Sequence, residues 1–183
     1  MGKNNIFRVM AGKYRGRSFR FVAMPELRPT PNKVRETLFN WLQFDIANTS
    51  CLDLFSGSGA LSFEALSRGA ANVLSVEKNL YAYQAIKQNA ATLSSNRLQV
   101  VHADAFDFLQ NNTKTFDLIL LDPPFQQDLI KKTLKILAKT TPPSTKIYIE
   151  SEFKITENIC SAPIQILKQK QSASVHYCLC KLT

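Results

Sequence analysis

The segment Asp53-Leu-Phe-Ser-Gly57-Ser-Gly59-Ala-Leu-Ser62 decides the fold of this 183-residue chain. It continues an apolar run that begins at Cys51, and it opens a helix. In open α/β sheets, glycines between a strand and a helix let the backbone approach a ligand closely. Ser62 stands where a dinucleotide fingerprint has its third glycine, so that match is imperfect. We therefore predict a nucleotide-type loop on an α/β sheet.

From about residue 51 onward, short apolar runs alternate with segments of helical periodicity. This alternation is typical of a parallel sheet with helices on both faces. We predict a doubly wound α/β core, with helices that include residues 83–93 and 130–137. The predicted strands are 51–55, 72–76, 98–102, 116–121 and 146–150, followed by two C-terminal segments that end near residue 182.

A different pattern precedes this core. Residues 6–22 indicate two short strands on either side of Lys13-Tyr-Arg-Gly-Arg17, where Gly16 can supply the turn, and a hairpin explains them best. We expect Thr30 to be the N-cap of the next helix and Pro31 its first residue. The apolar face of this helix is Val34, Leu38, Trp41 and Leu42.

Composition limits the classes of protein that this chain can represent. Its length and its 45% hydrophobic residues suit one domain over residues 1–183, which we divide into a basic hairpin extension (1–28) and a helix plus Rossmann-like core (29–183). No run approaches the roughly 20 apolar residues of a membrane span, and the polar start lacks a signal peptide, so we expect a cytoplasmic protein. Two histidines and four cysteines without a paired Cys-x-x-Cys predict no metal site and reduced cysteines.

A carboxylate follows the second predicted strand. Glu77 lies eighteen positions past Gly59, where a carboxylate can accept both hydroxyls of an adenosine ribose. NAD and S-adenosylmethionine both carry that ribose, so another residue must distinguish them. Asp53 would oppose a pyrophosphate but suits the cationic methionine end of S-adenosylmethionine. The predicted cofactor residues are Asp53, Phe55, Gly57, Ser58, Gly59, Glu77, Lys78, Asp104 and Ala105.

Two of these aspartates have simpler explanations. Asp104 follows the third strand, where it could accept a hydrogen bond from an adenine amino group. Alternatively, Asp104 caps the next helix and Asp53 caps a turn. Both alternatives remain open from the sequence.

Asp122-Pro123-Pro124-Phe125 directly follows the fourth predicted strand and is the predicted catalytic motif. The prolines stiffen the segment and leave the carbonyl of Pro123 free. Asp122 and that carbonyl can accept the two hydrogens of an exocyclic amine, while Phe125 stacks on an extruded base. Alternatively, the two prolines only end a strand. An aspartate favours guanine, whose N1–H and N2–H are adjacent donors, over adenine, although adenine-modifying families with Asp at this place are known.

These residues resemble the RsmD family of methyltransferases. The resemblance covers the N-terminal hairpin (8–17), the first helix (28–42), the cofactor segment (53–70) and the catalytic motif (122–125). It implies a Rossmann-like S-adenosylmethionine-dependent methyltransferase fold with a seven-stranded sheet, no metal, and methylation of the exocyclic N2 of a guanine in 16S rRNA. Small departures from the family pattern occur at Asn32, Lys33, Ser56 and Ser62.

The N-terminal region concentrates positive charge. The chain has 23 Lys and Arg against 14 Asp and Glu, a formal net charge of +9, and residues 1–35 contain nine of these cations but only one acid. Phosphate binding is the natural use of such a cluster, although a solvated surface is the simpler alternative. Arg35 has two alternative roles, contacting the cofactor or ordering the helix. The predicted RNA-binding residues are Arg8, Lys13, Arg15, Arg17, Lys33 and Arg35.

Three other functions share part of these patterns. A DNA adenine-N6 methyltransferase shares both motifs but usually needs additional recognition structure. A nicotinamide-dependent oxidoreductase leaves Asp122 to Phe125 unexplained, and a non-catalytic RNA-binding protein explains only the hairpin. Because the chain has no room for a large recognition domain, we expect a structured substrate, 16S rRNA within an assembling small ribosomal subunit, and a monomeric enzyme.

Overall fold

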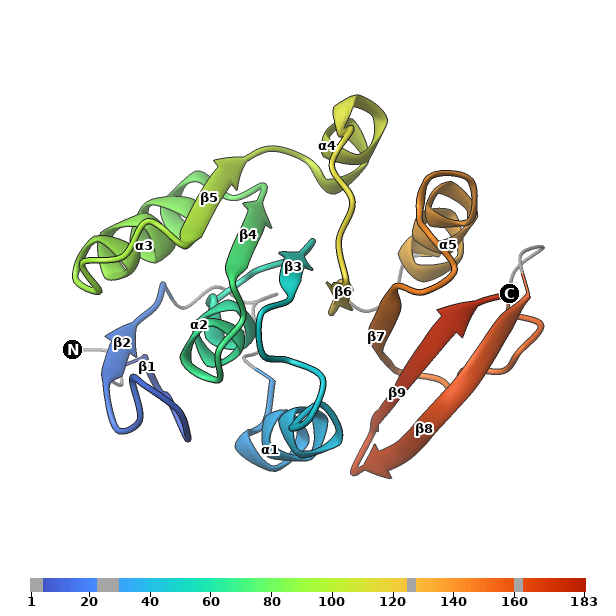
Figure 1. Cartoon of the computed structure of the whole chain (residues 1–183), viewed down its shortest axis with the longest axis horizontal. Helices are drawn as coiled ribbons and strands as arrows, with labels where there is room; N and C mark the ends of the chain where they lie inside the picture. The colour runs from blue at the N-terminus through green and yellow to red at the C-terminus, as the bar shows by residue number, and fades with distance from the viewer. Residues whose placement is uncertain (1–4, 23–29, 125–127, 160–162) are drawn as a thin grey trace.

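The computed structural model describes residues 5–22, 30–124, 128–159 and 163–183. Its centre is a seven-stranded sheet in the order β5-β4-β3-β6-β7-β9-β8 (Figure 1). The strands from β5 to β7 are parallel, and β9 and β8 add an antiparallel edge, so the predicted mostly parallel sheet is confirmed. The strands are β3 (Ser50–Asp53), β4 (Asn72–Glu77), β5 (Leu98–His102), β6 (Leu118–Leu121), β7 (Lys146–Ser151), β8 (Ile164–Ser172) and β9 (Val175–Leu182).

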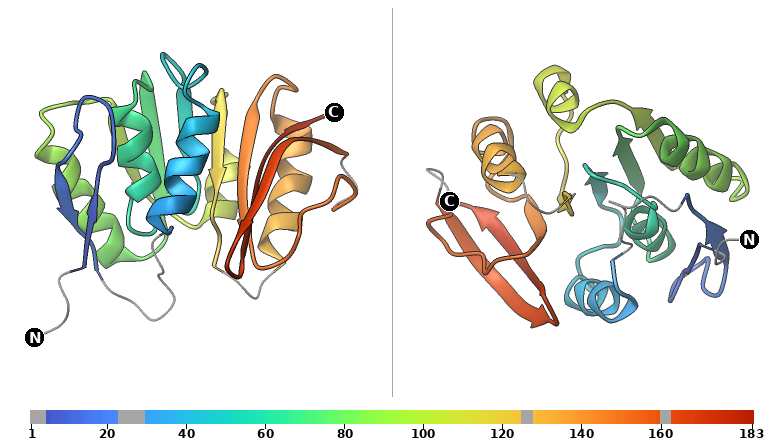
Figure 2. Two further views of the ribbon diagram at one scale, coloured as in Figure 1. Left: turned by 90° about the horizontal axis from the view of Figure 1, so that it is seen from below. Right: turned by 180° about the vertical axis from the view of Figure 1, so that it is seen from behind.

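Helices cover both faces of the sheet (Figure 2). One hydrophobic cluster joins α1, α2, α3 and the N-terminal hairpin to one face, and a second joins α4 and α5 to the other. Successive residues Cys51 and Leu52 of β3 belong to different clusters, as expected of a parallel strand buried on both faces. The helices are α1 (Asn32–Trp41), α2 (Ala60–Ser67), α3 (Leu80–Ala91), α4 (Ala105–Asn111) and α5 (Leu129–Thr140).

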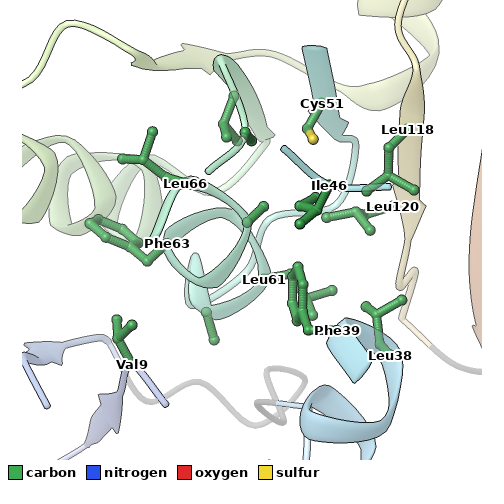
Figure 3. Packing of buried hydrophobic residues seen from close by; sticks show 14 of the residues in the cluster. Val9, Leu38, Phe39, Ile46, Cys51, Leu61, Phe63, Leu66, Leu118 and Leu120 are labelled. Carbon is green, nitrogen blue, oxygen red and sulfur yellow. The ribbon is translucent and has the colours of Figure 1, made fainter. Parts of the chain in front are cut away.

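The first cluster fixes the position of α1 and α2 above the middle of the sheet (Figure 3). Leu38 of α1, Phe63 of α2 and Leu120 of β6 are all almost fully buried in it. Complete burial of one such side chain contributes about 1.5–3 kcal/mol. The segments that flank the predicted cofactor loop are therefore held by the core.

The N-terminal hairpin is confirmed, and it is docked on α2. Strands β1 (Ile6–Arg8) and β2 (Ser18–Arg20) pair antiparallel as a separate two-stranded sheet. The carboxylate of Glu64 in α2 accepts hydrogen bonds from the backbone N–H groups of Met10 (2.9 Å) and Ala11 (3.2 Å). Ser67 accepts another from the N–H of Tyr14 (2.9 Å). The hairpin is thus fixed relative to the helix that follows the predicted cofactor loop.

Thr30 does not cap α1, so that prediction was wrong. The helix begins at Asn32, its N-cap position is Pro31, and no side chain accepts a capping hydrogen bond there. The Thr30 hydroxyl instead donates to Oδ2 of Asp122 at 3.0 Å. Thr30 therefore makes a long-range hydrogen bond to the predicted catalytic motif instead of a capping hydrogen bond at the start of α1.

Three cysteines, Cys51, Cys178 and Cys180, are buried and free, in agreement with the prediction, while Cys160 lies outside the described residues. Within the described ranges, no helix is long and apolar enough to cross a bilayer. No cluster of three or more metal-ligating His, Cys, Asp or Glu side chains occurs among the same residues.

Close packing of the hairpin on α2 makes Gly12 the less replaceable of two turn glycines. Gly12 and Gly16 both have positive φ angles, +80° and +85°, but a Cβ on Gly12 would lie 1.9 Å from the carbonyl oxygen of Ser67. A Cβ on Gly16 would meet nothing closer than 3.4 Å. We predict that Gly12→Ala lowers the free energy of unfolding by at least about 1 kcal/mol more than Gly16→Ala, measured by urea denaturation. Equal destabilisation by the two substitutions would contradict the docked hairpin.

Candidate active site

The two predicted motifs meet at one edge of the sheet. Asp53 ends β3 and Asp122 directly follows β6, and these two strands are paired neighbours. The strand order reverses here, because β4 and β5 extend to one side of β3 while β6 and β7 extend to the other. Open α/β sheets bind ligands at such a switch point, outside the carboxyl ends of the strands.

Two glycines shape the loop between β3 and α2. Gly57 and Gly59 have φ angles of +53° and +80°, in the left-handed region that side chains disfavour. A Cβ on Gly59 would also lie 3.2 Å from side-chain atoms of Phe63 and Ile86. Gly59 occupies the N-cap position of α2, so the loop turns sharply into the helix as predicted.

Asp53 is a completely buried acceptor with one oxygen unused. Its Oδ2 accepts a hydrogen bond from the Ser62 hydroxyl at 2.6 Å, and Ser62 lies 2.5 Å from the hydroxyl of Ser75. Its Oδ1 is buried and has no hydrogen-bond partner among the described residues. Burial raises the pKa of Asp53 to about 7, and the Ser62 hydrogen bond opposes that shift. A cationic donor at Oδ1 would satisfy the oxygen and favour the ionised form.

Ser62 therefore has a role in this site. It replaces the third glycine of the dinucleotide fingerprint, and its hydroxyl orients the Asp53 carboxylate. The Asp53 side chain bonds to Ser62 instead of capping a turn, so the structure does not support the alternative role of Asp53 as a turn cap.

Glu77 connects the glycine loop to α3. Its Oε2 accepts from the backbone N–H of Gly57 at 2.7 Å, and its Oε1 accepts from the N–H of Asn79 at 2.7 Å. Burial raises the pKa of Glu77, and these backbone hydrogen bonds oppose the shift. A carboxylate offers about four lone-pair sites, so both oxygens keep capacity for ribose hydroxyls.

Asp104 caps α4, which was one of its two predicted roles. Its Oδ1 accepts from the backbone N–H of Phe106 at 2.8 Å, and its Oδ2 lies 3.4 Å from Nζ of the exposed Lys78. Contact with an adenine stays a prediction. Of the remaining predicted cofactor residues, Phe55 is half-buried, Ser58 is buried in the loop, and Ala105 is buried in the second hydrophobic cluster.

Asp122 is half-buried, and one of its oxygens is already used. Thr30 donates to Oδ2, and burial raises the pKa of Asp122 to about 6 while this hydrogen bond opposes the shift. Pro123 is buried and Pro124 is exposed. Phe125 lies outside the described residues.

A second buried acid, which was not predicted from the sequence, lies beside Asp122. Leu121, the last residue of β6, pairs with Ile149 of β7. Asp122, the next residue after β6, is therefore adjacent to Glu150, the next residue of β7. Glu150 is 2% exposed and accepts a hydrogen bond from the Tyr148 hydroxyl at 2.9 Å. Burial and then the negative charge of Asp122 raise its pKa well above the usual range. The sequence carries one sign of this pair, because Tyr148 and Glu150 are polar residues two positions apart in an apolar strand.

Five of the six predicted RNA-binding cations are exposed. Arg8, Lys13, Arg15 and Arg17 are exposed, as is Lys33 at the start of α1. None of them belongs to the four salt bridges found within the described residues. Arg17 also donates to the carbonyl of Thr92 at 3.1 Å, beside a groove between β2 and α3.

Arg35, the sixth, is buried, and its prediction as an RNA-binding residue disagrees with its position. Its side chain is 1% exposed, and its Nη2 donates to the carbonyl of Arg8 at 2.8 Å and to Oδ1 of Asn32 at 2.9 Å. Burial lowers the pKa of this guanidinium. Arg35 ties the hairpin to α1, which agrees with the alternative that it orders the helix.

The two serines near Asp53 allow its electrostatics to be tested. Ser62→Ala removes a hydrogen bond that lowers the pKa of Asp53, so we predict that this pKa rises, as measured by the carboxyl carbon resonance during an NMR titration. Ser56→Ala is the matched control, because Ser56 donates to the backbone carbonyl of Asp53 and not to its side chain. An equal shift in both variants would refute the assigned role of Ser62.

Comparisons with known proteins agree with this geometry. A family model described as "Conserved hypothetical protein 95" matches residues 7–181. The Ribosomal RNA small subunit methyltransferase D of Escherichia coli (strain K12) is 37% identical over 172 residues, which cover 93% of this chain and 87% of that protein. The solved structure of the Escherichia coli protein yhhF has a TM-score of 0.85 at 37% identity and covers 97% of this chain and 98% of that one.

A more distant structure shares the fold alone. It is a 16S rRNA N2 methyltransferase of T. thermophilus in complex with AdoMet and guanosine, with 18% identity and a TM-score of 0.69, and it covers 98% of this chain and 50% of that one. The family model and the identity to the Escherichia coli relative extend over nearly all of the sequence. This chain therefore belongs to the RsmD family of methyltransferases.

Proposed function

We propose that this protein transfers a methyl group from S-adenosylmethionine to the exocyclic N2 of a guanine in 16S rRNA. The observation that carries the proposal is the meeting of Asp53 and Asp122 at the switch point of the sheet, each with one carboxylate oxygen held by a hydroxyl. The name of the Escherichia coli relative supports rRNA of the small subunit as substrate.

The residues around the glycine loop suit S-adenosylmethionine better than NAD. Oδ1 of Asp53 would accept from the methionine ammonium, and Glu77 would accept from the ribose hydroxyls. A pyrophosphate would meet the buried carboxylate of Asp53 as a like charge. When bound, the sulfonium supplies an electrophilic methyl group. Phe55, Gly57, Ser58, Gly59, Lys78, Asp104 and Ala105 complete the proposed cofactor site.

The motif after β6 would hold and activate the base. Because Thr30 occupies Oδ2 of Asp122, Oδ1 is available to accept one hydrogen of the guanine amino group, and the carbonyl of Pro123 accepts the other. Holding both hydrogens localises the nitrogen lone pair and aligns it for attack. Asp122 then receives the proton that the methylated nitrogen releases. Pro124 stiffens the segment, and Phe125 is proposed to stack on the extruded base.

Guanine is the preferred base because its N1–H and N2–H form a pair of donors that matches a carboxylate. Adenine presents an unprotonated N1, which would face Asp122 as a second acceptor. Methylation of adenine N6 is the competing reaction, and the product nucleoside distinguishes the two.

The basic surface of the hairpin would bind the RNA backbone. Arg8, Lys13, Arg15, Arg17 and Lys33 are exposed and are not neutralised by carboxylates among the described residues. Since the hairpin is docked on α2, phosphates bound there would lie at a fixed position relative to the glycine loop.

The form of the substrate is a further part of the proposal. We propose one domain that acts as a cytoplasmic monomer on 16S rRNA in an assembling small ribosomal subunit, and the name of the Escherichia coli relative supports a small-subunit substrate. Equal methylation rates on naked rRNA and on the assembled subunit would contradict this substrate.

Removal of the Asp122 carboxylate tests the catalytic assignment. We predict that Asp122→Ala abolishes N2 methylation of 16S rRNA, measured by mass spectrometry of nucleosides from treated RNA, because the amine loses its acceptor. Binding of S-adenosylmethionine, measured by calorimetry, should remain within about threefold of the original protein. Asp107→Ala, which removes an exposed carboxylate on α4, is the control. Retained methylation in the Asp122 variant, or tight binding of NAD, would refute the proposed reaction.

Salt dependence tests the basic surface. We predict that the double variant Lys13→Ala, Arg15→Ala weakens RNA binding and reduces the slope of log K against log salt by about 0.7–0.9 for each phosphate that the protein no longer neutralises. These positions are preferable to Arg17, which also donates a hydrogen bond to Thr92. Lys168→Ala with Lys170→Ala removes the same charge from the exposed edge strand β8 and should change the slope less. Identical slopes for both double variants would mean that the hairpin has no special role in binding RNA phosphates.

A further inference from the structure

A pocket lies at the carboxyl edge of the sheet, beside the proposed catalytic corner. It has a volume of about 690 Å³ and lies between the start of α5 and the loop of residues 152–159 that follows β7. Both elements flank the motif after β6, because α5 follows that motif in the chain and β7 pairs with β6 (Figure 1). We call this cavity the α5 pocket. Its volume is typical of small-molecule sites and suits one nucleotide.

The α5 pocket is close enough to Asp122 to hold a neighbour of the methylated base. Asp122 is adjacent to Glu150 across two paired strands, whose backbones are about 5 Å apart. Phe153 lies three residues after Glu150, which is at most about 11 Å of extended chain. The backbones of Phe153 and Asp122 are therefore within about 16 Å of each other. A stacked strand advances about 3.4 Å per nucleotide, so this limit corresponds to about five nucleotides.

The loop that forms one wall of the pocket is held by the core. Ile155 is completely buried in the second hydrophobic cluster, and its carbonyl accepts a hydrogen bond from Nε2 of Gln169 in β8 at 2.8 Å. The Ser151 hydroxyl, at the end of β7, donates to the carbonyl of Phe153. Phe153 is nevertheless 39% exposed and lines the pocket. An anchored backbone thus presents an aromatic ring at the pocket.

Lysines border the pocket on two sides. Lys154 is an exposed lining residue and belongs to none of the four salt bridges within the described residues, so its ammonium can bind a phosphate. Lys131 also lines the pocket and is paired with the carboxylate of Asp128 at 3.3 Å. Lys135 and Lys139 continue the row of Lys131 along α5, and both are exposed. This charge favours a polyanion over an apolar peptide.

The other lining groups suit a base. Phe153 offers a ring for stacking, and every base has a face that can stack on it. Thr156 and Asn158 line the same pocket and supply hydrogen-bond donors and acceptors, while the Glu152 carboxylate is an acceptor for an exocyclic amine. A cation, a ring and hydrogen-bonding groups together fit a whole nucleotide better than an inorganic anion.

We propose that the α5 pocket binds a nucleotide of the rRNA strand that flanks the target guanine, with its base on Phe153 and its phosphate on Lys154. This inference rests on the proposed function, because it requires that the base held at Asp122 belongs to an RNA strand. Extrusion of a base removes the stacking that it shared with its neighbours. The ring of Phe153 restores stacking to one neighbour, so the free-energy cost of extrusion falls.

Substitutions of Phe153 test the stacking. Small ribosomal subunits from cells that lack this enzyme are the substrate, and Kd is measured by filter binding. We expect Phe153→Ala to raise Kd about tenfold and Phe153→Trp to raise it much less, with the affinity for S-adenosylmethionine unchanged. Phe44→Ala is the matched control, because Phe44 is 90% exposed and precedes β3, at the opposite edge of the sheet. An unchanged Kd in Phe153→Ala, or an equal rise in Phe44→Ala, would overturn the inference.

The salt dependence of the same binding tests Lys154. We expect Lys154→Ala to reduce the slope of log K against log salt by about 0.7–0.9, the value of one phosphate contact. Lys114→Ala is the control, because Lys114 is exposed and precedes β6, also at the opposite edge. Equal slopes for the two variants would refute the phosphate contact in the α5 pocket.

Crosslinking identifies the occupant of the pocket. A benzophenone amino acid in place of Phe153, irradiated on the same subunits, should crosslink to 16S rRNA within about five nucleotides of the methylated guanine, as mapped by primer extension. The same group in place of Phe44 should give no crosslink there. Crosslinks from position 153 to distant RNA, to a ribosomal protein or to a second copy of this chain would overturn the inference.

Failure of this inference can be distinguished from failure of the proposed function. Binding and crosslinking need no turnover, whereas the product nucleoside and the Asp122→Ala variant report on the reaction. If N2-methylguanine forms only with Asp122 present while the crosslinks map elsewhere, the α5 pocket alone is refuted. If Asp122→Ala is active or another nucleoside is methylated, the proposed reaction is wrong and this inference falls with it.

Discussion

The desolvation of three carboxyl groups at one edge of the sheet is the constraint on which this site depends. Asp53, Asp122 and Glu150 lie at or near the carboxyl ends of β3, β6 and β7, and burial raises the pKa of each. A buried carboxylate normally needs a cation or several donors. Here each receives one hydroxyl hydrogen bond, from Ser62, Thr30 and Tyr148 respectively. Part of the free-energy cost of burying these carboxyl groups therefore remains uncompensated, and a bound ligand can reduce it.

Hydrogen bonds to α2 link the basic N-terminal hairpin to the glycine loop. The carboxylate of Glu64 and the hydroxyl of Ser67 hold the hairpin backbone on α2, and α2 begins at the glycine loop. Arg35 of α1 also holds the hairpin, because its guanidinium donates a hydrogen bond to the backbone carbonyl of Arg8. These bonds use side chains of regular helices to fix an irregular segment, so the hairpin behaves as part of the rigid core. Surface cations on it then sit at defined distances from the switch point, as a positioning role requires.

Much of this site could be predicted because its motifs are contiguous. The glycine loop, Glu77 and the Asp-Pro-Pro segment each follow a strand, and parallel strands deliver such residues to one edge. Thr30 and Glu150 could not be found in that way. Thr30 reaches Asp122 across 92 positions of the sequence, and Glu150 meets it only through the register of β6 on β7. Local patterns also failed for Arg35, because a charged residue on a helix gives no sign that a separate hairpin will bury it.

The choice of hydroxyl donors over cations also bears on the charge of the ligand. A lysine or arginine beside Asp53 would satisfy its carboxylate and lower its pKa, but it would repel a sulfonium or ammonium group brought to the same place. A serine satisfies one oxygen and leaves the negative charge unneutralised. At Asp122 the same logic applies to a nitrogen that becomes cationic as its bond to the methyl group forms. Carboxylates and hydroxyls at the switch point thus favour positive charge at both places that the proposed reaction requires, the cofactor at Asp53 and the methylated nitrogen at Asp122.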